Sequence, residues 1–515
     1  MKYLLAILFF WICCSQITDA IAQDADWIRY RVVDQKTKNP IPFASVQIKS
    51  RRTGVVTNAD GDFQIPVRYS VYGDTLMISC IGYDTKISPM RGLNPQALQT
   101  ILLVQSSTVL SAVEVKGGKS GRLTAYKVVK AAIHNLPYNA ISDPYSYDAY
   151  YRDYQFEDSI YVNLNEALLQ VIDSGFASND QLKTRIALLD YIPNETFKRD
   201  PTSAIAYDNR EKKFIPNAKV GTFGGNELMI LRIHDPLRNS NQFSFSFVNV
   251  FNKDFLTNHY FSFGNPTTRD GVELFNIKIE SKYTAAGASH NAVGNLYIEK
   301  GNFAFHKMEY RVYETEKEKK ILLYDIAVEY SRKEKYMHPN YISFSNLFKM
   351  KNPQDFIDTA VYVDTDADAF VVYTNHRVDD RTANDSSHFE LRANGRRLLI
   401  KDVKVVDQNQ IYLFLDKNPG FNIHVSAKTM TAMMKFKFKG VKDYDGRELN
   451  VPSYITVNQF REVFIQQTGL PVEYNKFNYM NPLIPLSEQI LVGSESNSNR
   501  WMNTPLKKKE NNSVE

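Results

Sequence analysis

This chain of 515 residues carries 62 Lys and Arg against 57 Asp and Glu, which gives a formal net charge of +5 at pH 7. Because the two signs are interspersed, we expect no concentrated basic surface of the kind that binds nucleic acid. The length allows about three or four domains, and the 31 Tyr and 31 Phe favour strands, since aromatic side chains suit pleated, half-buried surfaces.

Residues 1–22 have the pattern of a secretory signal peptide. Met1-Lys2 gives a basic start, residues 3–14 form an apolar core too short to span a bilayer, and Ala20-Ile21-Ala22 offers a cleavage site. The sequence therefore predicts an exported protein whose mature chain begins at Gln23. A membrane anchor, or lipidation at Cys13 or Cys14, is the alternative.

Residues 26–104 have the pattern of a small β-sandwich with short alternating runs between turns. Ala44, Val46 and Ile48 fall on one strand face, and the turn residues at 58–61 predict a chain reversal before Phe63. Cleavage of the leader leaves Cys80 as the single cysteine. We expect it to be a buried small hydrophobe on the strand face of Leu76 and Ile78.

Three motifs in this stretch resemble the carboxypeptidase regulatory-like domain of Bacteroidetes envelope proteins. They are a Pro-hydrophobic-Ala-x-Val strand at 42–46, a Thr-Asn-x-x-Gly-x-Phe turn at 57–63 and an Ile-Gly-Tyr close at 81–83. The resemblance implies a seven-stranded-type sandwich and a location in the periplasm or at the outer membrane. It implies no reaction.

Residues 105–145 are predicted to be a linker followed by an amphipathic helix. Leu123, Tyr126, Val129 and Ile133 recur at helical spacing, and Leu136-Pro137 is expected to end the helix. The segment 125–152 resembles the region C-terminal to the regulatory-like module in Bacteroidetes proteins of unknown function, and this resemblance brings no activity.

Residues 146–355 are predicted to form a large, curved, half-barrel-like antiparallel sheet, because consecutive strands are joined by short turns. One of the predicted strands spans residues 242–250, and short helices are expected near 182–189 and 226–233. The layout is similar to the lipoprotein-carrier fold of the Gram-negative envelope, which has a hydrophobic concave face.

Residues 360–455 are predicted to form a second sandwich. Val378-Asp379 and the later run Val441-Lys442-Asp443, with Gly446 and Leu449, resemble the opening and closing strands of bacterial Ig-like domains. Residues 456–515 are Pro- and Asn-rich around aromatic residues. They are expected to form an extended arm across the preceding domains, or an arm that docks a partner chain.

The chain has no constellation that predicts catalysis. His306 and Glu309 have the His-x-x-Glu spacing of zinc carboxypeptidases, with His424 downstream, but residues three apart on a strand point to opposite faces. Asp364, Asp366 and Asp368 are spaced like a calcium loop that lacks its glycine and its glutamate. We expect no catalytic residue, no metal and no cofactor.

The sequence thus favours a mainly β, secreted, non-enzymatic envelope protein that binds an apolar or extended ligand or a protein partner, with peripheral outer-membrane association open. If the curved sheet is a ligand cradle, alternate aromatic residues should line it; otherwise they fill a core. These candidates are Phe243, Phe245, Phe247, Phe261 and Phe263. An exported metallocarboxypeptidase-like hydrolase and an accessory of a TonB-linked uptake system are the alternatives.

Overall fold

The computed structural model forms two compact units, Met1–Phe348 with Val457–Glu515, and Lys349–Thr456. The chain is mainly β, as predicted. The expected leader lies outside the described residues. These are 27–49, 51, 53–95, 97–106, 123–157, 160–201, 226–316, 319–352, 354–364, 366–393, 395–416, 434–474, 478–493 and 500–506.

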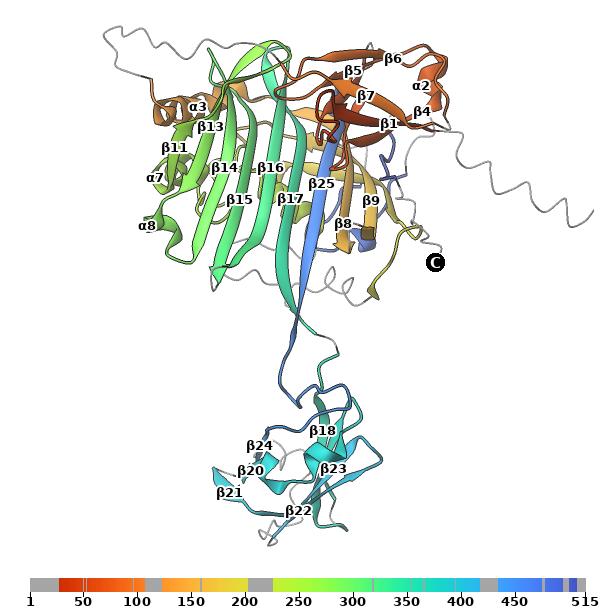
Figure 1. Ribbon diagram of the computed structural model, residues 1–515, viewed down its shortest axis with the longest axis vertical. Coiled ribbons are helices and arrows are strands. Elements are labelled where there is room, and N and C mark those ends of the chain that lie inside the picture. The colour runs from red at the N-terminus through yellow and green to blue at the C-terminus, as the bar shows by residue number, and fades with distance from the viewer. Residues whose placement is uncertain are drawn as a thin grey trace, which may run out of the picture. The chain divides into compact units, whose positions relative to one another are not determined.

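The predicted N-terminal sandwich is confirmed, with a three-stranded sheet β4-β1-β7 packed against a four-stranded sheet β3-β2-β5-β6 (Figure 1). Its elements are β1 (Trp27–Asp34), β2 (Ser45–Lys49), β3 (Gly54–Val56), β4 (Asp62–Pro66), α2 (Val67–Val71), β5 (Thr75–Ser79), β6 (Lys86–Pro89) and β7 (Gln99–Leu103).

The turn before β4 has the predicted chemistry. Asn58 Oδ1 accepts hydrogen bonds from the backbone N of Asp60 and Asp62, and Gly61 has φ of 73°. A Cβ atom on Gly61 would lie 2.5 Å from the Val32 carbonyl oxygen. The turn therefore requires glycine both for its positive φ and for this close approach. Cys80 follows β5 instead of lying on it. It is half-buried against the sandwich core, and burial raises the pKa of its thiol to about 11.

One large antiparallel sheet dominates the first unit, in the order β10-β9-β8-β25-β17-β16-β15-β14-β13-β11, with β12 paired to β13. β10 and β11 are its two edges. The strands are β8 (Tyr145–Glu157), β9 (Ile160–Asp173), β10 (Arg185–Pro193), β11 (His259–Phe263), β12 (Thr267–Arg269), β13 (Val272–Ser281), β14 (His290–Glu299), β15 (Phe305–Glu316), β16 (Lys319–Lys333), β17 (Tyr336–Lys351) and β25 (Tyr454–Leu470).

Three predictions about this sheet need correction. Residues 185–189, expected to be part of a short helix at 182–189, belong to β10. Residues 456–470, expected to begin an extended arm, belong to β25, which fills the gap between β8 and β17. Residues 242–250, expected to be a strand, form successive turns. Their alternation of Phe and Ser mimics a strand, but each buried Phe packs from a loop onto the sheet face below.

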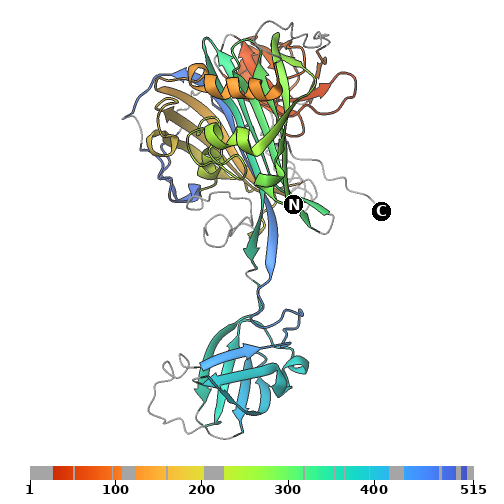
Figure 2. The ribbon, with the colours of Figure 1, turned by 90° about the vertical axis from the view of Figure 1, so that its left-hand side faces the viewer.

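Helices cover one face of the sheet, called here the inner face (Figure 2). They are α3 (Ala125–Asn139), α6 (Glu227–Ile233) and α7 (Phe251–Asn258). Inward-pointing side chains such as Ala149, Leu169, Ile277 and Tyr310 share one core with these helices. α3 runs three residues beyond the predicted stop at Leu136, and two further short helices are α4 (Asp180–Lys183) and α8 (Tyr283–Ala286).

The opposite, outer face is covered near β8, β9, β17 and β25 by the N-terminal sandwich and by the C-terminal strap, defined as residues 500–506. Trp501 is 4% exposed and belongs to the sandwich core. Its indole Nε1 donates to the Gln64 carbonyl oxygen at 3.0 Å, and its own carbonyl oxygen accepts from Gln466 Nε2 of β25 at 2.6 Å. Asn503 Oδ1 accepts from Gln64 N at 2.9 Å. The strap therefore ties the sandwich to the sheet.

The second unit is a β-sandwich inserted between β17 and β25, with sheets β18-β19-β23-β22 and β21-β20-β24. Its predicted opening and closing segments meet, since Val378 bridges Asp443 and Asp379 N donates to the Lys442 carbonyl oxygen at 2.8 Å. The elements are β18 (Asp358–Asp364), β19 (Ala369–Thr374), α9 (Asp380–Ala383), β20 (Phe389–Ala393), β21 (Arg396–Leu398), β22 (Ile400–Val406), β23 (Gln410–Leu415) and β24 (Met434–Phe438).

None of the helices in the described part of the chain combines the length and the apolar character needed to cross a membrane.

Replacing Trp501 with Ala should destabilise the first unit by about 3–5 kcal/mol, because it empties a buried indole site and breaks the contact between strap and sandwich. Urea unfolding and limited proteolysis of the sandwich measure the effect. Tyr138→Ala, at a side chain that is 71% exposed, is the control and should change stability by less than about 0.5 kcal/mol. Equal stability of the two variants would contradict a strap that ties the sandwich down.

Glu462 of β25 offers a second test. Its carboxylate accepts from Arg152 Nε at 2.6 Å and from Tyr341 Oη at 2.7 Å, and both members of the ion pair are buried. Glu462→Gln should cost about 3–5 kcal/mol, because it leaves a buried guanidinium without its counter-charge. Glu157→Gln removes an exposed pair with Lys198 and should cost less than about 1 kcal/mol in the same urea unfolding.

Candidate functional site

The structure does not bring the five candidate phenylalanines together as one lining. Phe245 and Phe247 are buried in the inner core, and Phe261 packs against it. Phe243 and Phe263 are 55% and 40% exposed. The contacts of the three inward-facing rings match the alternative in which these side chains fill a core.

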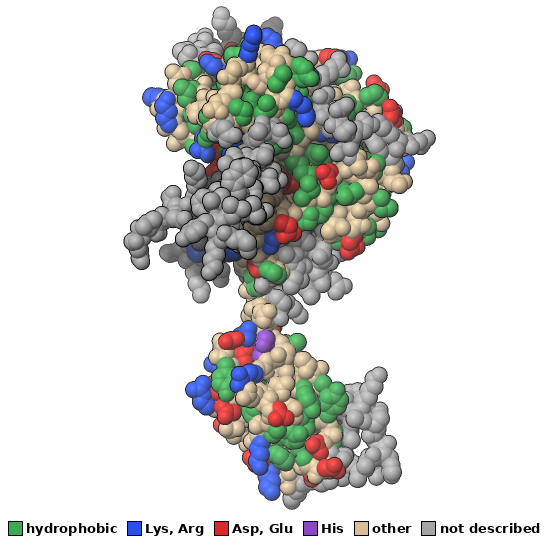
Figure 3. Space-filling model, turned by 90° about the vertical axis from the view of Figure 1, so that its right-hand side faces the viewer, with side chains coloured by type: hydrophobic (Ala, Val, Ile, Leu, Met, Phe, Trp, Pro, Cys, Tyr) green, Lys and Arg blue, Asp and Glu red, His purple; other side chains and the backbone are tan. Residues whose placement is uncertain are grey.

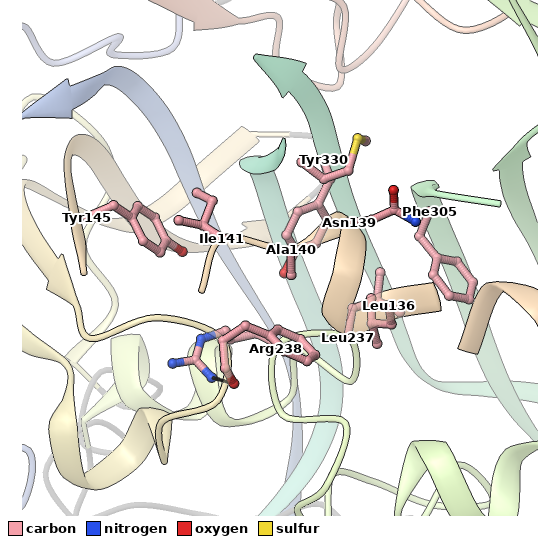
Figure 4. A pocket seen from close by; sticks show the side chains of 11 residues that line it. Leu136, Asn139, Ala140, Ile141, Tyr145, Leu237, Arg238, Phe305 and Tyr330 are labelled. Atoms are coloured by element: carbon pink, nitrogen blue, oxygen red, sulfur yellow. Dashed lines mark hydrogen bonds between the residues drawn. The ribbon is translucent and has the colours of Figure 1, made fainter. Parts of the chain in front are cut away.

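An apolar hollow does exist on the inner face, between the end of α3 and strands β15 to β17 (Figure 4). Leu136, Ile141, Tyr145, Phe305 and Tyr330 are among its lining residues. Its cavity volume is about 30 Å³, which is the room of one or two water molecules. Ligand pockets usually measure about 300 to 1,000 Å³, so this hollow does not hold a lipid chain.

Beside this hollow lies a buried ionic cluster whose charges are paired. Arg238 donates to both carboxylate oxygens of Asp173, at 2.8 and 2.7 Å, and Arg232 pairs with Asp180. Tyr330 Oη donates to Asp235 at 2.7 Å, and burial raises the pKa of Asp235. Arg238 also donates to the Gly175 carbonyl oxygen. The cluster fixes the loops above the sheet.

The zinc spacing at His306 does not assemble a ligand set. The register shifts between Tyr297 and Ile298 make His306 an extra, bulged residue at the start of β15. His306 Nε2 lies 3.0 Å from Glu299 Oε2, whereas Glu309 Oε1 pairs with Lys307 Nζ at 2.8 Å. His424 lies outside the described residues, and the part that is described contains no group of three or more His, Cys, Asp or Glu able to hold a metal.

The acidic run in the second unit forms a turn. Asp364 Oδ1 accepts from the backbone N of Asp366 and of Ala367, at 3.1 and 2.9 Å. The Asp364 carboxylate therefore stabilises the turn by accepting hydrogen bonds from nearby backbone amides.

Larger hollows lie between the N-terminal sandwich and the sheet, and together they are called here the module groove. There are two lobes, of about 770 and 370 Å³. Both are lined by Ser45 and Gln47 of β2, by Arg332 of β16 and by Glu334 of the β16–β17 turn. Hydrogen bonds hold one end, where Gly82 N donates to the Thr268 carbonyl oxygen at 2.9 Å and Thr85 Oγ1 donates to Asp270 at 2.6 Å. At the other end Thr53 bridges Gln467 of β25.

The two lobes differ in charge. The larger, acidic lobe is lined by four carboxylates against two arginines: Asp84, Asp270, Glu273 and Glu334, with Arg269 and Arg332. The smaller, basic lobe is lined by three cations against one carboxylate: Arg51, Arg332 and Lys333, with Glu334. On the face drawn in Figure 3, the described Lys and Arg side chains are interspersed with Asp and Glu.

Buried polar atoms in the groove walls lack partners among the described residues. In the acidic lobe these are His306 Nδ1 and Ser331 Oγ, and in the basic lobe His338 Nδ1. Burial lowers the pKa of His306, and that of His338 to about 4, so both rings are neutral at pH 7. Such atoms would gain a hydrogen bond from a polar ligand or from water.

Sequence patterns alone do not predict this groove. Ser45 and Gln47 alternate with buried Val46 and Ile48, which predicted a polar strand face, but nothing in the sequence places the turn at 332–336 opposite that face. The groove forms only because the N-terminal sandwich packs against the large sheet.

Comparison with known proteins supports the predicted family resemblance of the N-terminal sandwich. Residues 28–115 match the family model of the CarboxypepD_reg-like domain. No curated protein matches the chain. A crystal structure of a DUF1329 family protein from Desulfovibrio piger shows 8% sequence identity and a TM-score of 0.20, covering 44% of this chain and 87% of that one. A similarity at this level supports no structural or functional inference.

Stability should fall in acid because of His259. Its ring is buried against Phe255 and Tyr310, and burial lowers its pKa from 6.5 to about 4. Below pH 6.5 His259 becomes protonated in the unfolded chain but stays neutral in the folded chain. The contribution of His259 to the free energy of unfolding is therefore lost as the pH falls from 6.5 towards 4. It amounts to about 3 kcal/mol.

Urea unfolding from pH 7 to pH 4 measures this effect. His259→Gln should lose about 3 kcal/mol less than the wild type over that range, and the exposed His134→Gln should follow the wild type. Parallel pH profiles for all three proteins would show that His259 does not carry the effect.

Proposed function

We propose that the protein is an exported, non-enzymatic protein of the Bacteroidetes cell envelope that binds an extended polar segment of a partner protein in the module groove. The match of residues 28–115 to the CarboxypepD_reg-like domain supports a modular, scaffold-type protein. The leader pattern supports export, and the resemblance of residues 125–152 supports the Bacteroidetes origin. The motif pairing around Val378 and Asp443 supports an Ig-like second unit.

The observation that carries the proposal is the module groove itself. It combines volumes of about 770 and 370 Å³ with walls held by hydrogen bonds at both ends. A wall fixed before binding reduces the ordering cost of a ligand. The unpartnered His306 Nδ1, Ser331 Oγ and His338 Nδ1 offer hydrogen bonds along its length. The groove is therefore suited to a polar, extended occupant, and the 30 Å³ inner hollow is not suited to an apolar one.

The placement of the buried ion pairs supports a non-enzymatic role. Arg152 with Glu462, and Arg461 with Glu227, are buried ion pairs between neighbouring elements. Neither pair lines the module groove. Buried ion pairs of this kind occur in structural networks as well as in active sites. Here both members of each pair are fixed parts of the fold.

Selection of a random peptide library against the mature protein tests the proposal. We expect extended polar peptides to be enriched and to protect the backbone amides of β2 and of residues 332–334 in hydrogen exchange. Gln47→Trp fills the junction of the two lobes and should weaken their binding by at least about tenfold, which corresponds to 1.4 kcal/mol.

Gln410→Trp, at a half-buried strand position of the second unit, is the matched control and should leave peptide binding unchanged. The proposal fails if no peptide is enriched, or if the selected peptides bind Gln47→Trp as well as they bind the wild type.

A further inference from the structure

The basic lobe of the module groove contains a lysine with no acidic partner. Lys333 is the last residue of β16, and its ammonium group donates to Thr468 Oγ1 of β25 at 2.8 Å. Among the described residues, no carboxylate lies within ion-pair distance of Lys333. The neighbouring cations differ in this respect, because Arg332 pairs with Glu299 and Arg51 pairs with Asp74, each at 2.8 Å.

The surroundings of Lys333 add polar side chains and one carboxylate that does not pair with it. His338 of β17 lines the same lobe, and its Nδ1 is buried without a partner among the described residues. Glu334 is the single carboxylate in the lining, and its side chain is exposed. Arg51 approaches from the sandwich, and Asn340 from β17 is already bonded to Glu329. A half-buried ammonium in such a lobe has given up part of its hydration without gaining a counter-charge from the fold, which is unfavourable for a charge.

We propose that the basic lobe binds an anionic oxygen group, a carboxylate or a phosphate, which supplies the counter-charge that Lys333 lacks. The lobe, of about 370 Å³, has room for such a group and for the chain that carries it. Lys333 acts as a compact point charge with rotatable donors, which suits either kind of oxyanion. This inference rests on the proposed function, because it assigns the chemistry of the partner segment at one end of the groove.

The protonation of Lys333 agrees with this geometry. Burial lowers the pKa of its ammonium from 10.5 to about 8. The charged and titratable groups that face it are Arg332 beside it on β16, Glu334 on the following turn, Arg51 from the sandwich and His338 from β17. A bound anion favours the protonated form, so affinity should be full near pH 7 and fall as the pH rises through 8.

Competitive amine labelling of the mature full chain, read by mass spectrometry, tests the inference. At pH 8 we expect Lys333 to react faster than the exposed Lys335, which lies on the same turn. Inorganic phosphate, or a capped short peptide with a free C-terminal carboxylate, should protect Lys333 at about 10 mM or below. The amidated form of that peptide should not protect it.

Lys333→Met keeps the length of the side chain without its charge and should weaken binding of the protecting anion by at least about tenfold. Lys335→Met is the matched control and should bind normally. Protection by phosphate alone assigns a phosphate group, and protection by the carboxylate peptide alone assigns a carboxylate. Absence of protection, or equal protection of Lys335, overturns the inference. If Lys333→Met fails to fold, the labelling of the wild type still decides.

The outcomes also separate this inference from the proposed function. If library peptides bind and Gln47→Trp blocks them, but Lys333→Met binds them normally, the peptide groove stands and the anion site is wrong. If anions protect Lys333 but no peptide is enriched, the anion site stands and the peptide-binding function fails.

Discussion

The insertion of β25 between β8 and β17 is the constraint on which the rest of the first unit depends. Without it the large sheet would be two separate pieces, one of residues 145–193 and one of residues 259–351. Buried charges mark the joint, since Glu462 meets Arg152 of β8 and Tyr341 of β17, and Arg461 reaches Glu227 of α6. Because β25 lies about three hundred residues from β8 in sequence, the sheet closes through long-range pairing, which tends to fold slowly.

The return of the chain to the sheet as β25 also explains why the protein has two units. β17 and β25 are neighbours in the sheet, so the second unit occupies the place of a hairpin loop between them. Chain ends that lie close together let a whole domain be inserted without disturbing the host sheet. After β25 the strap carries Trp501 into the sandwich core, so the first and last described segments of the chain hold each other in place.

The module groove and the filled inner face result from one docking arrangement. Helices and the loop with Phe245 and Phe247 occupy the inner face, and the apolar hollow between α3 and strands β15 to β17 is of water size. On the outer face the sandwich makes contact at its two ends, through Gly82 with Thr268 and through Thr53 with Gln467. Between these contacts the polar strand face of β2 stays apart from the turn at Arg332.

The sequence by itself determined the local features, because short-range chemistry sets them. Alternation and the Asn58–Gly61 turn predicted the first sandwich, and a motif resemblance predicted the second. Only the tertiary structure decided that residues 456–470 are a central strand and that the Phe-rich loop at 242–250 packs as core. It also decided that Lys333 faces a groove without a counter-ion. Periodicity in the sequence indicates which side of a strand is apolar. The neighbours of that strand in the sheet depend on contacts with residues that can be hundreds of positions away. A groove exists only between the surfaces that those contacts bring together.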